Sequence, residues 1–349
     1  MQRQSTTLFG ASLLCIVLLF WGSRLPVPYV RDVPGPVSDA LSSSAGKLLI
    51  AIGKPTPTPR GKLLLLTVNE FGGPRENTTS YNVLAGWWNR SDAIIPRDLL
   101  FSKKDTPQSV EQTGNTQMIQ SQEDAKIAAL RYLGFQLTPG VDVAAVNVAE
   151  LKKTLLVDDV IVGFDGTPVS NADQLHALTA KHKAGDHVVL QVKRGSAPLD
   201  VPTTMQPPPS GSTSSPSIGI SVVNSFVKPF TIGIDLAHVV GPSAGTGFAI
   251  GIVDKLTDGN LTSGHTVAVT GTIDADGKVG AIGGVVQKMA GARRAGATLF
   301  LVPKDNCSEA LTAIPHGLTV APISTLSGAV SVLKQFAAGD ANLPTCTES

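Results

Sequence analysis

The chain opens with its longest apolar run. Residues Leu8 to Trp21 are fourteen apolar or small residues without a charge, and Arg3 and Arg24 flank them. About 20 apolar residues cross a bilayer core, so both a signal peptide and a membrane anchor fit. Because no small-x-small cleavage site follows cleanly, we expect an uncleaved single-pass anchor over residues 8–23. A cytoplasmic tail at 1–7 would then precede it, and the bulk of the chain would be extracytoplasmic.

Two later stretches lack any apolar pattern. Residues 24–60 are rich in Ser, Pro and Gly and end in alternating prolines, which is typical of an extended stalk. Residues 206–217 read QPPPSGSTSSPS and offer almost no side chain that can pack. We therefore expect a linker there that separates two domains.

Between these stretches, short apolar segments alternate with turns. Residues 62–68, KLLLLTV, form a continuous run that suits a buried strand. Ser121 to Leu133 has helical apolar spacing, and Ser121 with Asp124 resembles a capping box. Residues 141–195 then alternate short strands with one helix. We expect a β-rich module over 121–205 that the strand at 62–68 completes, so that 61–120 is a strand plus an insertion.

The segment after the linker alternates strands and helices. We predict strands at 230–236, 266–270 and 297–302, and helices at 244–256 and 285–295. This order implies an α/β domain over 218–340, followed by a tail at 341–349. The fold class of the whole chain is therefore α+β.

Composition excludes several function classes. Lys and Arg total 28 against 27 Asp and Glu, a net charge of +1, which argues against a nucleic-acid partner. Three cysteines cannot form a four-ligand zinc site. No HExxH pair occurs among the six histidines, and we expect neither metal nor cofactor. Whether Cys307 and Cys346 form a disulfide is left open.

Three polar residues stand in settings that suit catalysis. Ser243 lies between the glycines of Gly241-Pro-Ser-Ala-Gly245, directly before a predicted helix, although serine is also a common helix N-cap. Lys288 lies among apolar and small residues early in the next helix, where a solvated surface lysine is the alternative. Thr270 ends the AVTG strand. His238, five residues before the serine, is a rival base.

These motifs together resemble the proteolytic domain of Lon-type proteases. The resemblance covers residues 218–340: GPSAG, the VTG strand end, GKVGAIGGVVQK and AGARRAGATLFLVPKDN occur in the family's order. It implies that Ser243 is the nucleophile and Lys288 the general base of a Ser-Lys dyad. Thr270 would orient the lysine amine, and Gly241, Ala244 and Gly245 would form the turn and oxyanion-binding amides. The chain departs from the family where acids are common, at Val240, Thr272 and Gln287.

Residues 121–205 resemble a PDZ module of the bacterial protease type. The matching segments are GVDVAAV, LLVDDVIVGFDGTPVSNADQLHAL and HVVLQVKRG. Val157 stands where a glycine usually precedes the aspartate. The resemblance implies that Leu133, Gly134 and Phe135 supply backbone amides that bind a peptide carboxylate. A plain helix stop at Gly134 is the alternative.

The order of anchor, PDZ-like module and Lon-like domain is similar to that of bacterial membrane-anchored proteases. It implies a serine endopeptidase that selects protein or peptide substrates through the PDZ module. No G-x-x-x-x-G-K-[ST] string occurs, so we expect no use of ATP. The resemblance also permits a homo-oligomer. The alternatives are a catalytically idle binding scaffold at the membrane and a chaperone that does not cleave.

Overall fold

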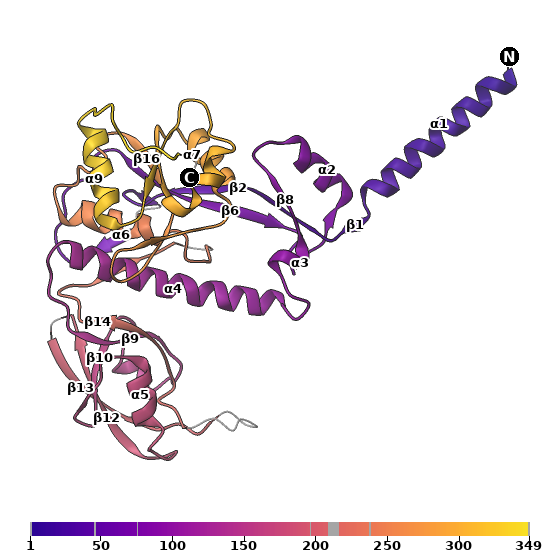
Figure 1. Ribbon diagram of the computed structural model, residues 1–349. Coiled ribbons are helices and arrows are strands. Elements are labelled where there is room, and N and C mark those ends of the chain that lie inside the picture. Colours follow the sequence, from indigo (N-terminus) through magenta and orange to yellow (C-terminus); the bar gives the residue numbers. More distant parts are fainter. Residues whose placement is uncertain are drawn as a thin grey trace.

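The computed structural model describes residues 2–44, 47–74, 76–195, 197–208, 216–236 and 239–347. Two lobes are visible, each built on its own β-sheet, with the long helix α4 (Pro107–Tyr132) running between them (Figure 1). The larger lobe contains both the region before α4 and the C-terminal region. The smaller lobe contains β9 to β14 and α5. The α+β fold class is therefore confirmed for this part of the chain.

The larger lobe is organised by a mixed sheet of six strands in the order β20-β19-β16-β6-β2-β8. Strand β6 pairs in parallel with β16 and antiparallel with β2. Residues Leu63 to Leu66 are all buried, as expected for a strand that is covered on both faces. The six strands are β2 (Tyr29–Asp39), β6 (Lys62–Phe71), β8 (Ala93–Pro96), β16 (Thr266–Val269), β19 (Leu299–Pro303) and β20 (Thr319–Ile323).

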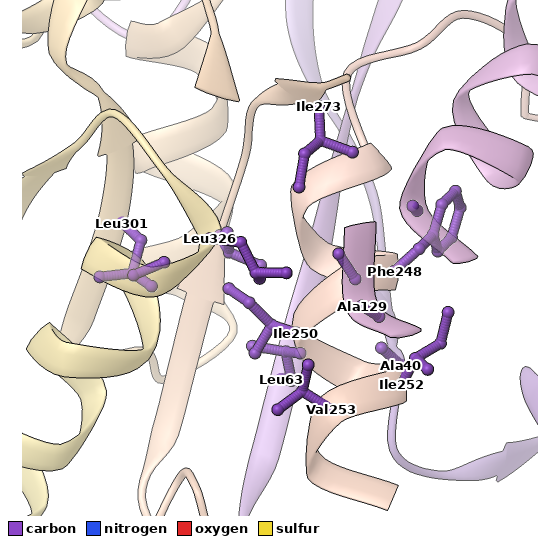
Figure 2. Close-up of a cluster of buried hydrophobic side chains, with 14 of the residues drawn as sticks. Ala40, Leu63, Ala129, Phe248, Ile250, Ile252, Val253, Ile273, Leu301 and Leu326 are labelled. Carbon is purple, nitrogen blue, oxygen red and sulfur yellow. The ribbon is translucent and has the colours of Figure 1, made fainter. Parts of the chain in front are cut away.

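Helices cover both faces of this sheet. On one face, α4, α6 (Gly245–Leu256) and α9 (Leu326–Ala337) pack on Leu63, and Figure 2 shows Phe248 of α6 and Ala129 of α4 in the same cluster. On the other face, α7 (Val285–Arg294) and α8 (Cys307–Leu311) pack on Leu64. The expected strands and helices near 244–302 are confirmed as α6, β16, α7 and β19.

The expected stalk and insertion are wrong. Residues 29–39 form β2 inside the large sheet, and β5 (Ile50–Ile52) pairs with β15 (Ile232–Ile234). The strand at 62–68 exists as β6, but it completes the larger lobe and not the β-rich module. Residues before α4 therefore supply central parts of the larger lobe.

The smaller lobe has the strand order β13-β12-β10-β9-β14, with β11 paired to β10. Its core includes Ile161, Phe164 and Leu190, all almost fully buried. Because β13 and β14 belong to the same sheet, residues 206–217 do not separate the two domains as we expected. The elements are β9 (Pro139–Val146), β10 (Val160–Phe164), β11 (Thr167–Pro168), α5 (Ala172–Thr179), β12 (His187–Arg194), β13 (Ala197–Thr204) and β14 (Ile220–Phe226).

Helix α4 begins earlier than its sequence pattern indicates. Thr106 and Ser109 form a reciprocal capping box, and Pro107 occupies the first turn. Ser121 lies in the middle of the helix and does not start it. The expected module boundary at 121 therefore falls inside a continuous helix of 26 residues.

The N-terminal helix α1 (Gln2–Ser23) projects away from the larger lobe (Figure 1). Among the residues that the structure describes, no helix is both long and apolar enough to cross a membrane. The expected anchor over 8–23 and the single-pass location derived from it are therefore wrong, because the apolar run of α1 is only the fourteen residues Leu8 to Trp21.

Several short elements complete the chain. The tail expected at 341–349 is tied to the larger lobe, because Cys346 forms a disulfide with Cys307 at the start of α8. The other elements are β1 (Pro26–Val27), β3 (Ser43–Ser44), β4 (Lys47–Leu48), β7 (Thr78–Thr79), α2 (Ser80–Trp88), α3 (Arg97–Leu100), β17 (Thr272–Ile273) and β18 (Val279–Gly280). The 3-10 turns span Leu151–Lys153 and Lys304–Asn306.

Candidate active site

Ser243 lies in the tight loop that leads into α6. The loop begins at Gly241, whose φ of +93° is left-handed and favours glycine. The amide of Gly241 donates to the carbonyl oxygen of Gly114 on α4 at 3.0 Å. The amide of Gly245 donates to the carbonyl oxygen of Pro242 at 3.2 Å. The Gly241 amide therefore joins the loop to α4 and the Gly245 amide closes the turn, while Ser243 itself stays partly exposed.

The end of β16 is joined directly to the backbone of Ser243. The amide of Gly271 donates to the Ser243 carbonyl oxygen at 2.9 Å, and the hydroxyl of Thr270 donates to the same oxygen at 3.3 Å. The amide of Thr246 in turn donates to the Gly271 carbonyl oxygen at 3.0 Å. Thr270 is therefore bonded to the backbone of Ser243; its expected contact with the lysine amine stays a prediction.

Lys288 lies in the first turn of α7 and is only 3% exposed. Burial lowers the pKa of its amine from 10.5 to about 8, and the nearby carboxylate of Glu309 acts in the opposite direction. At pH 7, roughly one such amine in ten is neutral, against about one in three thousand at the ordinary pKa. Lys288 is therefore not the solvated surface lysine that the sequence left open as the alternative.

The start of α7 is held by two side chains that our sequence reasoning missed. Glu309 accepts a hydrogen bond from the amide of Val285 at 3.2 Å. Asn306 accepts from the amide of Ile282 and donates to its carbonyl oxygen, both at 2.9 Å. The signal was present in the PKDN segment, where polar residues directly follow a buried strand.

Helix α6, which follows Ser243, and helix α7, which carries Lys288, lie on opposite faces of the same sheet. Helix α6 precedes β16, and α7 connects β16 to its parallel neighbour β19. A crossover helix runs against its strands, so α7 begins at the carboxyl edge of β16. The hydrogen bonds of Thr270 and Gly271 bring Ser243 to this edge as well. The structure thus brings the backbone of Ser243 and the start of the helix that carries Lys288 to the same edge of the sheet.

Two other candidate sites are the rival base His238 and a cluster of carboxylates. His238, the rival base, lies outside the described residues. The carboxylate oxygens of Glu123, Asp142 and Asp158 lie within 4.8 Å of one another, in a spacing that could hold a metal ion. The ammonium group of Lys228 lies 2.5 Å from the carboxylates of both Glu123 and Asp142. Lys126 pairs with Glu123 and Asp158 as well, so lysines already pair with all three acids, and we assign no metal to them.

Two family models match the chain. Residues 238–334 match the Lon protease (S16) C-terminal proteolytic domain, and residues 120–205 match a PDZ domain. The chain carries a Lon proteolytic domain and a PDZ domain. The PDZ match ends with β13, whereas the sheet also includes β14, which comes after the proline-rich segment.

Two curated relatives are Lon proteases, and each matches less than a third of the chain. A mitochondrial Lon protease homologue of Candida dubliniensis is 42% identical over 129 residues, which is 31% of this chain and 12% of the relative. The Lon protease of Clostridioides difficile is 34% identical over 114 residues, 29% of this chain and 14% of the relative. The chain thus spans a small part of the length of these relatives.

A solved PDZ domain is similar to part of the chain. The PDZ domain of the SdrC-like protein from Listeria monocytogenes is 24% identical, with a TM-score of 0.22, and covers 24% of this chain and 87% of its own. The assignment of the PDZ domain rests on the family model, and not on this similarity.

The expected carboxylate-binding loop of the PDZ domain is occupied by the C-terminus of α4. The amide of Gly134, which has a φ of +83°, donates to the carbonyl oxygen of Arg131 at 2.9 Å. The amide of Phe135 donates to the carbonyl oxygen of Leu130 at 3.0 Å. The ring of Phe135 packs edge-on against the ring of Phe230, with 5.8 Å between their centroids. Leu133 and Phe135 also pack on the core of the Lon domain. The alternative of a plain helix stop fits these bonds, and the assignment of the segment to peptide binding stays a prediction.

Proposed function

We propose that this protein is a serine endopeptidase in which Ser243 is the nucleophile and Lys288 the general base. The observation that carries the proposal is the buried amine of Lys288, whose pKa is lowered to about 8 at the sheet edge where Ser243 lies. An amine can act as a general base only in its neutral form, and burial supplies that form near neutral pH.

The chemistry follows from these two groups. Neutral Lys288 accepts the proton of the Ser243 hydroxyl as the oxygen attacks the peptide carbonyl. The protonated amine then gives this proton to the leaving amine as the peptide bond breaks, which leaves an acyl-enzyme on Ser243. Water, deprotonated by the neutral lysine, hydrolyses the ester and restores the serine. The amide of Ala244, next to the nucleophile, is the candidate donor to the oxyanion.

We propose further that cleavage needs no ATP hydrolysis by this chain. The 349 residues contain no G-x-x-x-x-G-K-[ST] string that could bind the phosphates of a nucleotide. Without an unfolding motor, the substrates would be loosely folded or extended protein segments.

The PDZ domain would select these substrates by strand addition. Strand β14 is the last strand on one side of the order given for its sheet, and α5 lies beside it. The side chain of Asn224 on β14 accepts a hydrogen bond from the amide of Ala172, at the start of α5, at 2.7 Å. An extended peptide can add to a sheet edge of this kind. This supports a role of β14 and α5 in peptide binding.

A fluorophosphonate probe on the purified full chain tests the nucleophile and the base together. We expect covalent labelling at Ser243, its loss in Ser243→Ala, and a rate at least a hundredfold lower in Lys288→Ala. Cleavage of unfolded casein should follow the same order. A wild-type chain that is neither labelled nor able to cleave casein would favour the idle scaffold. Labelling that is indifferent to Lys288 would remove the dyad.

A further inference from the structure

Helix α4 contacts the loop that carries Ser243 at two points. The hydroxyl of Ser121 donates a hydrogen bond to the carbonyl oxygen of Pro242 at 2.9 Å. About two helical turns closer to the N-terminus of α4, the carbonyl oxygen of Gly114 accepts a hydrogen bond from the amide of Gly241 at 3.0 Å. Both contacts are made by the two residues that directly precede Ser243, so α4 holds the loop next to the proposed nucleophile.

The Ser121 contact is tightly packed. Ser121 is 4% exposed, and a Cβ atom added at Gly245 would lie only 2.6 Å from its hydroxyl oxygen. Glycine at the first position of α6 thus allows the two helices to approach closely. A serine hydroxyl within a helix often bonds to its own helix backbone, whereas this one donates to a carbonyl 121 residues away in the sequence.

We propose that Ser121 is a positioning residue for the nucleophile: its hydroxyl fixes the Pro242 carbonyl and so sets where the Ser243 hydroxyl stands relative to the base. The inference rests on the proposed function of Ser243. The Pro242 carbonyl also accepts the amide of Gly245 at 3.2 Å, so losing Ser121 would loosen the turn without abolishing it. A misplacement of about 1 Å at a reacting atom can cost a hundredfold in rate.

The position of Ser121 depends in turn on the junction with the PDZ domain. Two residues along α4, the buried carboxylate of Glu123 accepts hydrogen bonds from Ser225 of β14 at 2.8 Å and from Lys228 at 2.5 Å. Lys228 also bonds to Asp142 of β9. The same stretch of α4 therefore contacts the PDZ domain through Glu123 and the nucleophile loop through Ser121.

The test is the kinetics of fluorophosphonate labelling in the full chain, compared among wild type, Ser121→Ala, Ser121→Cys and Thr116→Ala. Thr116 is the matched control, because its hydroxyl bonds within α4 to the carbonyl oxygen of Gln112. The amplitude of labelling reports the fraction of folded molecules. The first-order rate constant at fixed probe concentration reports the reactivity of those molecules. A merely structural role of Ser121 would change the amplitude and leave the rate constant unchanged.

We expect the rate constant of Ser121→Ala to fall at least tenfold at every pH, while the midpoint of its pH profile stays where Lys288 sets it. Ser121→Cys, which keeps a weak donor of similar size, should give an intermediate rate, and Thr116→Ala should stay within twofold of wild type. Equal rate constants in Ser121→Ala and Thr116→Ala would overturn the inference alone. If Ser121→Ala gives no folded fraction, Ser121→Cys decides in the same way. Absence of labelling in wild type would instead overturn the proposed function.

Discussion

Glu309 accepts a hydrogen bond from the backbone amide of Val285 at 3.2 Å, three residues before the candidate base Lys288. Its carboxylate has two opposed effects on the site. As an acceptor at the start of α7, it holds the helix that carries the lysine. As a negative charge, it favours the protonated amine and so raises the pKa of Lys288 against the larger effect of burial. The two effects can be separated by substitution.

The variant Glu309→Gln keeps an oxygen that can accept the Val285 amide but removes the charge. We expect the pKa of Lys288 to fall further below about 8, because the negative charge of Glu309 that raises it is gone. The pH at half-maximal fluorophosphonate labelling should therefore decrease by about 0.5 to 1 unit. Glu150→Gln, at an exposed ion pair with Lys153, is the control. A midpoint that rises in Glu309→Gln would contradict this electrostatic account.

The wild-type protein should become more reactive as the pH rises through 8. Only the neutral amine of Lys288 can accept a proton, and its pKa is about 8. Labelling at Ser243 should therefore increase about tenfold per pH unit below pH 7.5 and level off above pH 9. Labelling rates measured from pH 6 to pH 10 test this. A flat profile, or a rise centred near 10.5, would mean that the amine is not shifted.

Replacement of Lys288 by methionine should abolish labelling and stabilise the fold at neutral pH. The pKa of Lys288 is lower in the folded state than its ordinary 10.5, so the folded state pays for a buried charge at every pH below about 8. This penalty fades between about pH 8 and pH 10.5, and both states hold a neutral amine only above that range. We expect a gain in unfolding free energy on the order of 3 kcal/mol at pH 7.

Urea unfolding at pH 7 and pH 10 measures this gain. It should be large at the lower pH and small at the higher one. The control is Lys278→Met, since Lys278 is exposed and its loss should change the free energy of unfolding by less than about 0.5 kcal/mol. A destabilised Lys288→Met at pH 7 would show that the buried amine is paired well enough to offset its desolvation.

The sequence was sufficient to find the Lon proteolytic domain because its signals are local. Apolar periodicity outlines α6, β16, α7 and β19 one by one, and the motifs around Ser243 and Lys288 occupy the helix starts between them. The apolar and small neighbours of Lys288 are compatible with its burial, but the sequence also left a solvated surface lysine open. What the motifs do not contain is the support of these residues from elsewhere in the chain.

The expected stalk and the expected helix start at Ser121 were wrong because they rested on local composition and not on contacts within the fold. Pro34, Gly35 and Pro36 suggest a stalk, but the pairing of β2 with β6 shifts register between Pro34 and Val37, and this irregularity accommodates them. Ser121 with Asp124 satisfies a local capping pattern, yet the serine hydroxyl bonds to Pro242. Local patterns cannot indicate a partner that lies 121 residues away.

The junction between α4 and the PDZ domain should be sensitive to Lys228. Its ammonium group lies 2.5 Å from the carboxylates of both Glu123 and Asp142, and all three side chains are at most 6% exposed. Lys228→Ala would leave two buried carboxylates without this partner, and breaking a buried pair costs about 3 to 5 kcal/mol. We expect a lower unfolding temperature and faster chymotrypsin cleavage at Phe226 of β14. Lys153→Ala, at an exposed pair, should change neither; equal behaviour of the two variants would contradict a stabilising junction.

The disulfide between Cys307 and Cys346 should stabilise the Lon domain from its C-terminal end. It joins two cysteines that are 39 residues apart in the sequence. Cys307, the first residue of α8, lies between Asn306 and Glu309, the two residues whose side chains hold the start of α7. Closing a loop of this length contributes about 3 to 4 kcal/mol in the chain-entropy model. We expect Cys346→Ala to lower the unfolding temperature and a reducing agent to reproduce this shift in wild type. Cys15→Ala, at an exposed free cysteine, is the matched control. A reducing agent that lowers the unfolding temperature of Cys346→Ala as much as that of wild type would show that its effect does not act through this bond.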